Sequence, residues 1–281
     1  MSGLTLSYEV IGDTGRPWII TPGGRYSKDD PGIRPLAEAI AAAGYRVVIW
    51  DRPNCGESDV CFEGGTESGM QADYLAALLR HLDMSPAVLL GGSGGARVSL
   101  LAAANHPDVA SAMALLWISG GVYGLMTLAG VYCGPSMRAA IVGGMEAVAE
   151  LPDWQEVISR NPGNRQRILA QDRDTFLATM ERWMAAYCPN SSELVPGLSN
   201  DEARSFDLPA LVFRSGTADM RNAAGKDGRP AGACVTATAG TAMARLVNWF
   251  RSHRAHQSRP PFPSHGTVLK GCLRSPRYQQ R

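Results

Sequence analysis

Patterned cysteines and long hydrophobic runs are both missing from this chain. Its six cysteines, among 281 residues, form no CxxC pair and no Cys/His spacing that suits zinc, so neither a zinc site nor a disulfide framework is expected. No segment reaches about 18 uninterrupted apolar residues, and the first residues lack the basic start and apolar run of a secretory signal. These absences favour a globular, cytoplasmic protein.

Acidic residues are nearly missing from the last part of the chain. Residues 221–281 contain eleven Lys and Arg and one acidic residue, Asp227, although the net charge of the whole chain is only +1. A basic tail can bind nucleic acid or an anionic membrane surface. No aromatic–basic repeat and no nucleic-acid motif accompanies it. We therefore expect neither nucleic acid nor a membrane as a partner.

Short apolar runs alternate with helix-forming segments in the first part of the chain. Such alternation is typical of a mostly parallel sheet with helices on both faces. The fold class predicted is therefore α/β. The expected strands cover residues 4–10, 17–21, 45–50, 86–90 and 112–118, and the expected helices cover residues 33–43, 66–82 and 96–105.

The strand signal stops between residue 122 and about residue 193, where Met, Trp, Ala and Glu recur at helical spacing. A strand pattern returns at residues 208–214. We predict a helical insertion with helices at residues 138–151, 155–160, 164–169 and 174–187. The predicted units are an α/β core of residues 1–121 and 201–250, a helical cap of residues 122–200, and an atypical basic tail of residues 251–281, for which disorder is an open alternative.

Four glycines surround Ser93 in the stretch Gly91-Gly92-Ser93-Gly94-Gly95, between a predicted strand and a predicted helix. The stretch fits G-x-S-x-G, the nucleophile elbow, in which glycines relieve crowding around a strained serine. A Walker A phosphate loop would need a Lys after its glycines, and Ala96 follows here. Ser93 is the candidate nucleophile. The start of the following helix can present the Gly94 N–H to a developing oxyanion.

With this elbow, the chain resembles the α/β-hydrolase fold family over roughly residues 3–220. Two loops add to the resemblance. The stretch Thr21-Pro22-Gly23-Gly24-Arg25 follows a strand where the family carries its second oxyanion donor, which implies the Gly24 N–H, although Pro22 stands where a histidine is usual. Residues 51–58 look like a shortened form of the family's Asp-x-Arg-Gly-x-Gly-x-Ser loop, whose role is structural.

The resemblance also implies an acid and a base after the elbow. Phe213-Arg214-Ser215-Gly216-Thr217-Ala218-Asp219 is similar to the strand and turn that carry the triad acid, which implies Asp219. His81 and His106 lie in or at the end of the two helices that flank the elbow strand, and we interpret both as structural or solvated. The general base is left open among His253, His256 and His265, because none of them precedes a clear closing helix.

A serine nucleophile points to acyl transfer. The sequence therefore favours a serine hydrolase that acts on a small or medium hydrophobic ester, lactone or C–C bond of a diketone, a small-molecule substrate held under the cap. No cofactor and no metal is expected. Two alternatives stay open: a catalytically weak ligand-binding protein of the same fold that lacks a proper triad histidine, and a perhydrolase or haloperoxidase-like activity.

Overall fold

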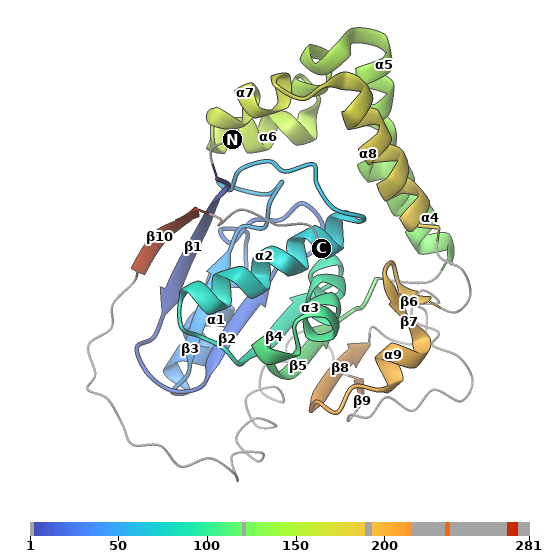
Figure 1. The fold of residues 1–281 in the computed structure, drawn as a ribbon. Helices are drawn as coiled ribbons and strands as arrows, with labels where there is room; N and C mark the ends of the chain where they lie inside the picture. Colours follow the sequence, from blue (N-terminus) through green and yellow to red (C-terminus); the bar gives the residue numbers. More distant parts are fainter. Residues whose placement is uncertain (1–2, 120–121, 189–192, 215–233, 237–268, 275–281) are drawn as a thin grey trace.

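The computed structural model describes residues 3–119, 122–188, 193–214, 234–236 and 269–274. Within them, eight strands form one sheet with helices on both sides (Figure 1), and two short strands form a separate hairpin. The strands of the main sheet are β1 (Thr5–Ile11), β2 (Pro17–Thr21), β3 (Arg46–Trp50), β4 (Ala87–Gly92), β5 (Ala110–Leu116), β8 (Ala210–Arg214), β9 (Cys234–Thr236) and β10 (Leu269–Arg274). The hairpin consists of β6 (Glu193–Val195) and β7 (Leu198–Ser199).

The strand order of the main sheet is β10-β1-β3-β2-β4-β5-β8-β9. Five adjacent pairs from β3 to β9 are parallel, whereas β1 is antiparallel to both β3 and β10. The strand β4 lies near the middle and is buried on both faces: Leu89 packs into one apolar cluster, and Val88 and Leu90 pack into the other. The predicted α/β class with a mostly parallel sheet is therefore confirmed.

Three helices cover the two faces of the sheet. The helix α1 (Ile33–Ala42) packs on one face through Ala37 and Ile40. On the other face lie α2 (Glu67–His81) and α3 (Gly94–Asn105), which contact each other. The start of α2 is fixed by the Thr66 side chain, which accepts a hydrogen bond of 2.8 Å from the Gly69 N–H and so satisfies one free donor of the first turn.

Five further helices occupy the described chain between β5 and the hairpin β6–β7 and stand apart from the sheet in Figure 1. Phe62, from a core loop, inserts its ring among Phe176, Trp154 and Trp183 of this cap, with ring centroids 5.0–6.4 Å apart. Aromatic packing therefore joins the cap to the core. The cap helices are α4 (Val122–Tyr132), α5 (Gly134–Ala149), α6 (Pro152–Arg160), α7 (Gly163–Leu169) and α8 (Arg173–Ala186).

Two features differ from the expected cap. The helix α4 was not expected, because it contains Gly124 and Gly130 and shows little polar alternation. The hairpin β6–β7 falls inside the range predicted as cap, yet Gly197 at its turn lies close to Leu101 of α3, and the short helix α9 (Asn200–Arg204) also contacts α3. This segment therefore packs on the core.

One helical stretch, Gly124–Arg160, is long and apolar enough to cross a membrane by length and composition alone. The stretch is not straight, because Gly144 has φ 70° and ψ −163° and kinks α5. Met145 and Val148, which follow the kink, pack into the same apolar cluster as α2 and α3. The second half of the stretch thus serves as part of the protein core.

The strand β10 occupies the edge of the sheet farthest from β9 and pairs with β1 from Thr5↔Arg274 to Val10↔Leu269. It falls in the range predicted as a basic tail, where no strand was expected. An edge strand is held by backbone hydrogen bonds on one side only, so it needs no long apolar run. The short sequence LKGCLR of β10, which mixes apolar residues with Lys270, Gly271 and Arg274, therefore carries little strand signal.

Asn164, in α7, provides a polar joint between cap and core. Its buried amide accepts a hydrogen bond from the Val60 N–H (2.9 Å) and donates to the carbonyl oxygens of Ser58 (3.0 Å) and Val157 (3.3 Å).

We expect Asn164→Ala to lower the free energy of unfolding by about 3 kcal/mol or more, because buried backbone groups lose their partners. Urea unfolding measures the change, with the exposed Asn105→Ala as a control that should stay within about 0.5 kcal/mol of wild type. Equal effects of the two substitutions would show that the hydrogen bonds of Asn164 between cap and core do not contribute to stability.

Candidate active site

Ser93 lies at the sharp turn from β4 into α3, with φ 50° and ψ −110°. Positive φ is uncommon for a residue with a side chain and persists only where the surroundings enforce it. Here the Ser93 N–H donates a 2.8 Å hydrogen bond to the carbonyl oxygen of Leu116 at the end of β5, and the Ser93 carbonyl accepts from the Ala96 N–H. The turn leaves the serine exposed beyond the end of the sheet.

Two of the four glycines around Ser93 are required by space. A Cβ atom on Gly95 would lie 2.0 Å from the carbonyl oxygen of Thr21, and a Cβ atom on Gly91 would lie 2.3 Å from the carbonyl oxygen of Gly95. Nothing lies within 4 Å of a Cβ atom built on Gly92. The outer glycines of G-x-S-x-G are therefore obligatory at this turn, as the sequence predicts.

The loop after β2 packs directly against the elbow. A Cβ atom on Gly23 would lie 2.6 Å from the carbonyl oxygen of Gly92, and a Cβ atom on Gly94 would lie 3.4 Å from the backbone nitrogen of Gly24. Within the described residues, neither the Gly24 N–H nor the Gly94 N–H donates a hydrogen bond. Gly94 also begins α3, where the helix dipole is positive. Two free donors thus lie beside the serine.

Arg52 holds this loop in place, a role that sequence reasoning missed. Its buried guanidinium donates from Nη2 to the carbonyl oxygens of Gly24 (2.9 Å), Gly23 (3.3 Å) and Tyr26 (3.4 Å). Turning these carbonyl groups toward Arg52 fixes the peptide planes of the loop and hence the direction of its N–H groups. The structural role implied for residues 51–58 is therefore the positioning of the loop after β2.

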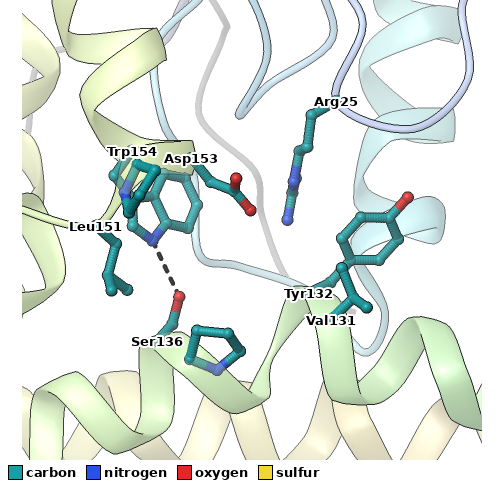
Figure 2. Close-up of a pocket in the computed structure, with 9 residues that line it drawn as sticks. Arg25, Val131, Tyr132, Ser136, Leu151, Asp153 and Trp154 are labelled. Carbon is teal, nitrogen blue, oxygen red and sulfur yellow. Dashed lines mark hydrogen bonds between the residues drawn. The ribbon is translucent and has the colours of Figure 1, made fainter.

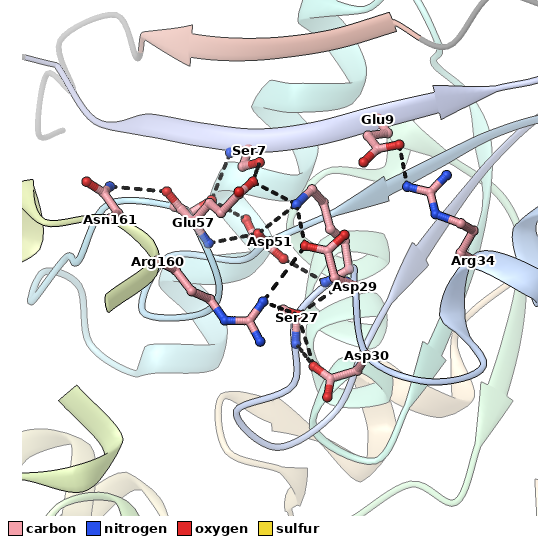
Figure 3. Close-up of polar contacts among 12 residues, drawn as sticks. Ser7, Glu9, Ser27, Asp29, Asp30, Arg34, Asp51, Glu57, Arg160 and Asn161 are labelled. Atoms are coloured by element: carbon pink, nitrogen blue, oxygen red, sulfur yellow. Dashed lines mark hydrogen bonds and ion pairs between the residues drawn. The ribbon is translucent and has the colours of Figure 1, made fainter. Parts of the chain in front are cut away.

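The same segment carries a network of charged groups (Figure 3). The oxygens of Asp29, Asp51 and Glu57 lie within 4.8 Å of one another, a spacing that would suit a metal ion. The Lys28 ammonium already pairs with all three carboxylates, at 2.8, 3.4 and 2.8 Å. Burial raises the pKa of Asp51, although backbone hydrogen bonds from Lys28 and Glu57 oppose the rise. A lysine therefore supplies the positive charge in this network.

This network also reaches the cap. Arg160, at the end of α6, donates to the Ser27 hydroxyl at 3.3 Å, and Asn161 donates to the carbonyl oxygen of Glu57 at 3.1 Å. Figure 3 shows both side chains approaching the core loops from the cap side. Cap and core loops are thus joined by polar contacts as well as by the ring of Phe62.

Arg25 follows the candidate oxyanion donor Gly24 and forms an ion pair with Glu67 at the start of α2. Its guanidinium carbon lies 4.9 Å from the ring centroid of Tyr132 and 5.6 Å from that of Trp154, a cation–π arrangement. Burial alone would raise the pKa of Glu67, but Arg25 and a hydrogen bond from Asn54 outweigh it and lower that pKa.

A small pocket opens where Arg25 meets the cap (Figure 2). It encloses about 450 Å³ including its open mouth. Figure 2 shows Arg25 entering between Asp153 on one side and Tyr132 on the other. The Tyr132 hydroxyl would lie 3.9 Å from a Cβ atom on Gly24, so this pocket adjoins the candidate oxyanion loop. The lining residues are Arg25, Val131, Tyr132, Pro135, Ser136, Leu151, Pro152, Asp153 and Trp154.

The remaining predicted residues fall into two groups. Asp219, His253, His256 and His265 lie outside the described residues. His81 and His106 are described and lie away from the elbow. His106 follows the last turn of α3, at the opposite end of that helix from Ser93, where its Nε2 lies 2.7 Å from Asp73. His81 ends α2 and is exposed.

Comparison with known proteins decides the fold. A family model described as alpha/beta hydrolase fold matches residues 19–127, from β2 through the elbow into α4. MGS-M2, an alpha/beta hydrolase enzyme from a Medee basin deep-sea metagenome library, superposes with a TM-score of 0.57 over 92% of this chain and 97% of its own, at 17% identity. The chain has the α/β-hydrolase fold. A thermophilic esterase from Thermogutta terrifontis shares this α/β-hydrolase architecture, with a TM-score of 0.56 over 89% of this chain and 94% of its own, at 20% identity.

Relatives by sequence match a shorter region. A 2-hydroxy-6-oxononadienedioate/2-hydroxy-6-oxononatrienedioate hydrolase from Escherichia coli O139:H28 (strain E24377A / ETEC) is 35% identical over 96 residues. The aligned part covers 34% of this chain and 31% of the relative, so the chain matches about a third of the length of these curated relatives. The likeness therefore concerns part of the α/β-hydrolase fold.

The steric requirement at the elbow can be tested directly. We expect Gly95→Ala to lower the free energy of unfolding by about 3 kcal/mol or to prevent folding, because the added methyl group would overlap the Thr21 carbonyl. Gly92→Ala, where space is open, should leave stability within about 1 kcal/mol of wild type. Thermal and urea unfolding measure both changes. A well-folded Gly95→Ala variant with unchanged stability would show that this contact is wrong.

The Arg25–Glu67 pair predicts a pH-dependent contribution to stability. The pKa of Glu67 is lower in the folded chain than in the unfolded chain, where it is about 4.3. The ionised Glu67 therefore contributes fully to the free energy of unfolding above that unfolded-state pKa, and the contribution is lost as the pH falls through the folded-state pKa. We expect Glu67→Gln to cost about 3 kcal/mol at pH 7, where Arg25 loses its partner, and less at pH 3.5.

Urea unfolding at pH 7, 5 and 3.5 checks the Glu67 prediction. Glu181→Gln, a change to an exposed glutamate in α8, serves as the matched control and should cost little at each pH. A difference between wild type and Glu67→Gln that stays constant from pH 7 to pH 3.5 would show that the Glu67 pKa is not lowered.

Proposed function

We propose that this chain is a serine hydrolase that acts by nucleophilic acyl transfer on an ester, a lactone or the C–C bond of a diketone. The observation that carries the proposal is the exposed Ser93 in a strained turn with two free N–H donors beside it. Two names agree with hydrolysis: the relative by sequence is a 2-hydroxy-6-oxononadienedioate/2-hydroxy-6-oxononatrienedioate hydrolase, and one structural neighbour is an enol-lactonase from Burkholderia xenovorans LB400.

In the proposed reaction, the Ser93 hydroxyl oxygen attacks the substrate carbonyl carbon while a histidine takes the hydroxyl proton. Asp219 orients that histidine, which is one of His253, His256 and His265. The Gly24 and Gly94 N–H groups donate hydrogen bonds to the tetrahedral oxyanion. Collapse releases the leaving group with the proton from the histidine, and water then hydrolyses the acyl-serine.

A weaker second candidate is a ligand-binding protein of this fold with little catalysis. It is favoured by one observation: within the described part of the chain, both histidines lie away from Ser93. A serine hydroxyl without a base is a poor nucleophile. The two candidates differ in whether Ser93 can form a covalent bond.

Labelling with a fluorophosphonate separates the two functions. We expect wild type to bind the probe covalently and Ser93→Ala to remain unlabelled, because the probe reacts only with an activated serine. Ser159→Ala, a change to an exposed serine of α6, is the matched control and should keep its label. Loss of Ser93 should also reduce hydrolysis of p-nitrophenyl butyrate by about 10³-fold or more.

Single changes of His253, His256 and His265 to Ala then identify the base, since only one of them should abolish labelling. Absence of label on wild type would favour the binding protein. Turnover that requires hydrogen peroxide would favour the perhydrolase alternative.

A further inference from the structure

Arg97 is a buried cation whose described partners are all uncharged. It is 3% exposed. Its Nε donates to the Ser68 hydroxyl at 3.4 Å, Nη1 to the hydroxyl and carbonyl oxygens of Ser119, and Nη2 to the Tyr187 hydroxyl at 3.4 Å. Among the described residues, no carboxylate forms an ion pair with Arg97. Because a guanidinium stays protonated in proteins, this charge is uncompensated within the described part of the chain.

The surroundings of Arg97 increase the imbalance. Arg25 and Arg52 lie in the same buried region, and the carboxylate that interacts with both is Glu67, which Arg25 already pairs with. Tyr187 interacts electrostatically with Arg97, Arg25 and Glu67, so these three charged groups lie around the same side chain. Glu67 therefore serves Arg25 and Arg52, and no described carboxylate forms an ion pair with Arg97. Buried charges are costly unless an opposite charge is nearby, so this region favours an added anion.

Few other acidic residues of the chain could pair with Arg97. The acidic residues outside the described part are Asp219 and Asp227. The proposed reaction already assigns Asp219 to the catalytic histidine. A counter-ion from outside the chain is thus the simplest partner for Arg97.

The position of Arg97 connects this charge to the elbow. Its Nη2 atom would lie 3.5 Å from a Cβ atom on Gly94, the residue that follows Ser93. The two serines and Tyr187 hold the guanidinium group, and its centre lies 5.5 Å from the Tyr187 ring centroid. One Nη2 hydrogen has no acceptor among the described residues. A fixed cation with a donor to spare therefore lies next to the nucleophile.

We propose that the substrate bears a carboxylate on its acyl portion and that Arg97 binds this carboxylate while Ser93 attacks the acyl carbonyl. Arg97 is the specificity-determining residue. The proposal rests on the proposed acyl-transfer function and narrows its substrates from esters, lactones and diketones in general to those with an anionic acyl portion. A guanidinium matches a carboxylate in charge and geometry, and a pair formed in a buried site is strong.

A matched pair of substrates tests this inference. The anionic 4-nitrophenyl hydrogen glutarate and its methyl ester, methyl 4-nitrophenyl glutarate, have the same acyl length and differ in one charge. We expect wild type to prefer the anionic ester by at least about 30-fold in kcat/KM. Arg97→Gln should reduce that ratio to near one by slowing the anionic ester alone. Arg138→Gln, a change to an exposed arginine of α5, should leave the ratio unchanged.

Two kinetic outcomes would overturn the proposal. One is a ratio near one in wild type, which would mean that the protein does not distinguish the anionic ester from the neutral ester. The other is an equal loss for both esters in Arg97→Gln, which would make Arg97 structural. If Arg97→Gln does not fold, Arg97→Lys provides the second variant. It keeps the positive charge but loses the planar guanidinium group with its paired donors, so it should lower the ratio of kcat/KM for the anionic ester over the neutral ester several-fold.

Binding without chemistry separates failure of this inference from failure of the hydrolase function. In Ser93→Ala, we expect calorimetry to show that monomethyl glutarate binds at least about 30-fold more tightly than dimethyl glutarate, and that adding Arg97→Gln removes the difference. This preference in a chain whose Ser93 takes no fluorophosphonate would uphold the anion site and reject the hydrolase. Labelling of Ser93 with equal binding of the two glutarates would reject the anion site alone.

Discussion

The close approach of the Thr21 carbonyl oxygen to the first turn of α3 is the contact on which the site depends. It is possible only because Gly95 has no side chain. The parallel pairing of β2, β4 and β5 brings the ends of these strands together, and the Leu116 carbonyl then holds the strained Ser93 from the other side. Sheet register and two glycines therefore place the nucleophile beside two N–H donors, and Arg52 fixes the loop that carries one of these donors.

Much of the core was predictable because its signals are local. The apolar runs of β2 and β4 and the helix between β2 and β3 carry strong patterns. The observed bounds of β2 equal the expected ones, and those of the other two elements differ by at most two residues. The elbow was predictable for the same reason, since strand, glycines and helix are contiguous. The hairpin β6–β7 was missed because it has only five residues in strands. The edge strand β10 was missed because its partner is at the other end of the described chain.

The charges behind the elbow were harder to foresee. Arg25 and Glu67 are 42 positions apart, and no spacing rule links them. Arg97 did carry a signal: it is the single charged residue in the helix GGARVSLLAAAN, whose other residues are uncharged and mostly small or apolar. A charge on the buried stretch of such a helix is expensive, so its presence indicates either a hidden partner or a function. Only the fold shows that its described neighbours are serines and a tyrosine.

The pairing of β1 with β10 has a consequence for synthesis on the ribosome. The two strands are separated by about 260 residues, so at typical rates β1 waits on the order of 10–50 s for its partner. Throughout that time the outer edge of β1 presents unpaired backbone groups, a surface on which nascent chains can aggregate. Translation speed and chaperone supply should thus influence the yield of this protein.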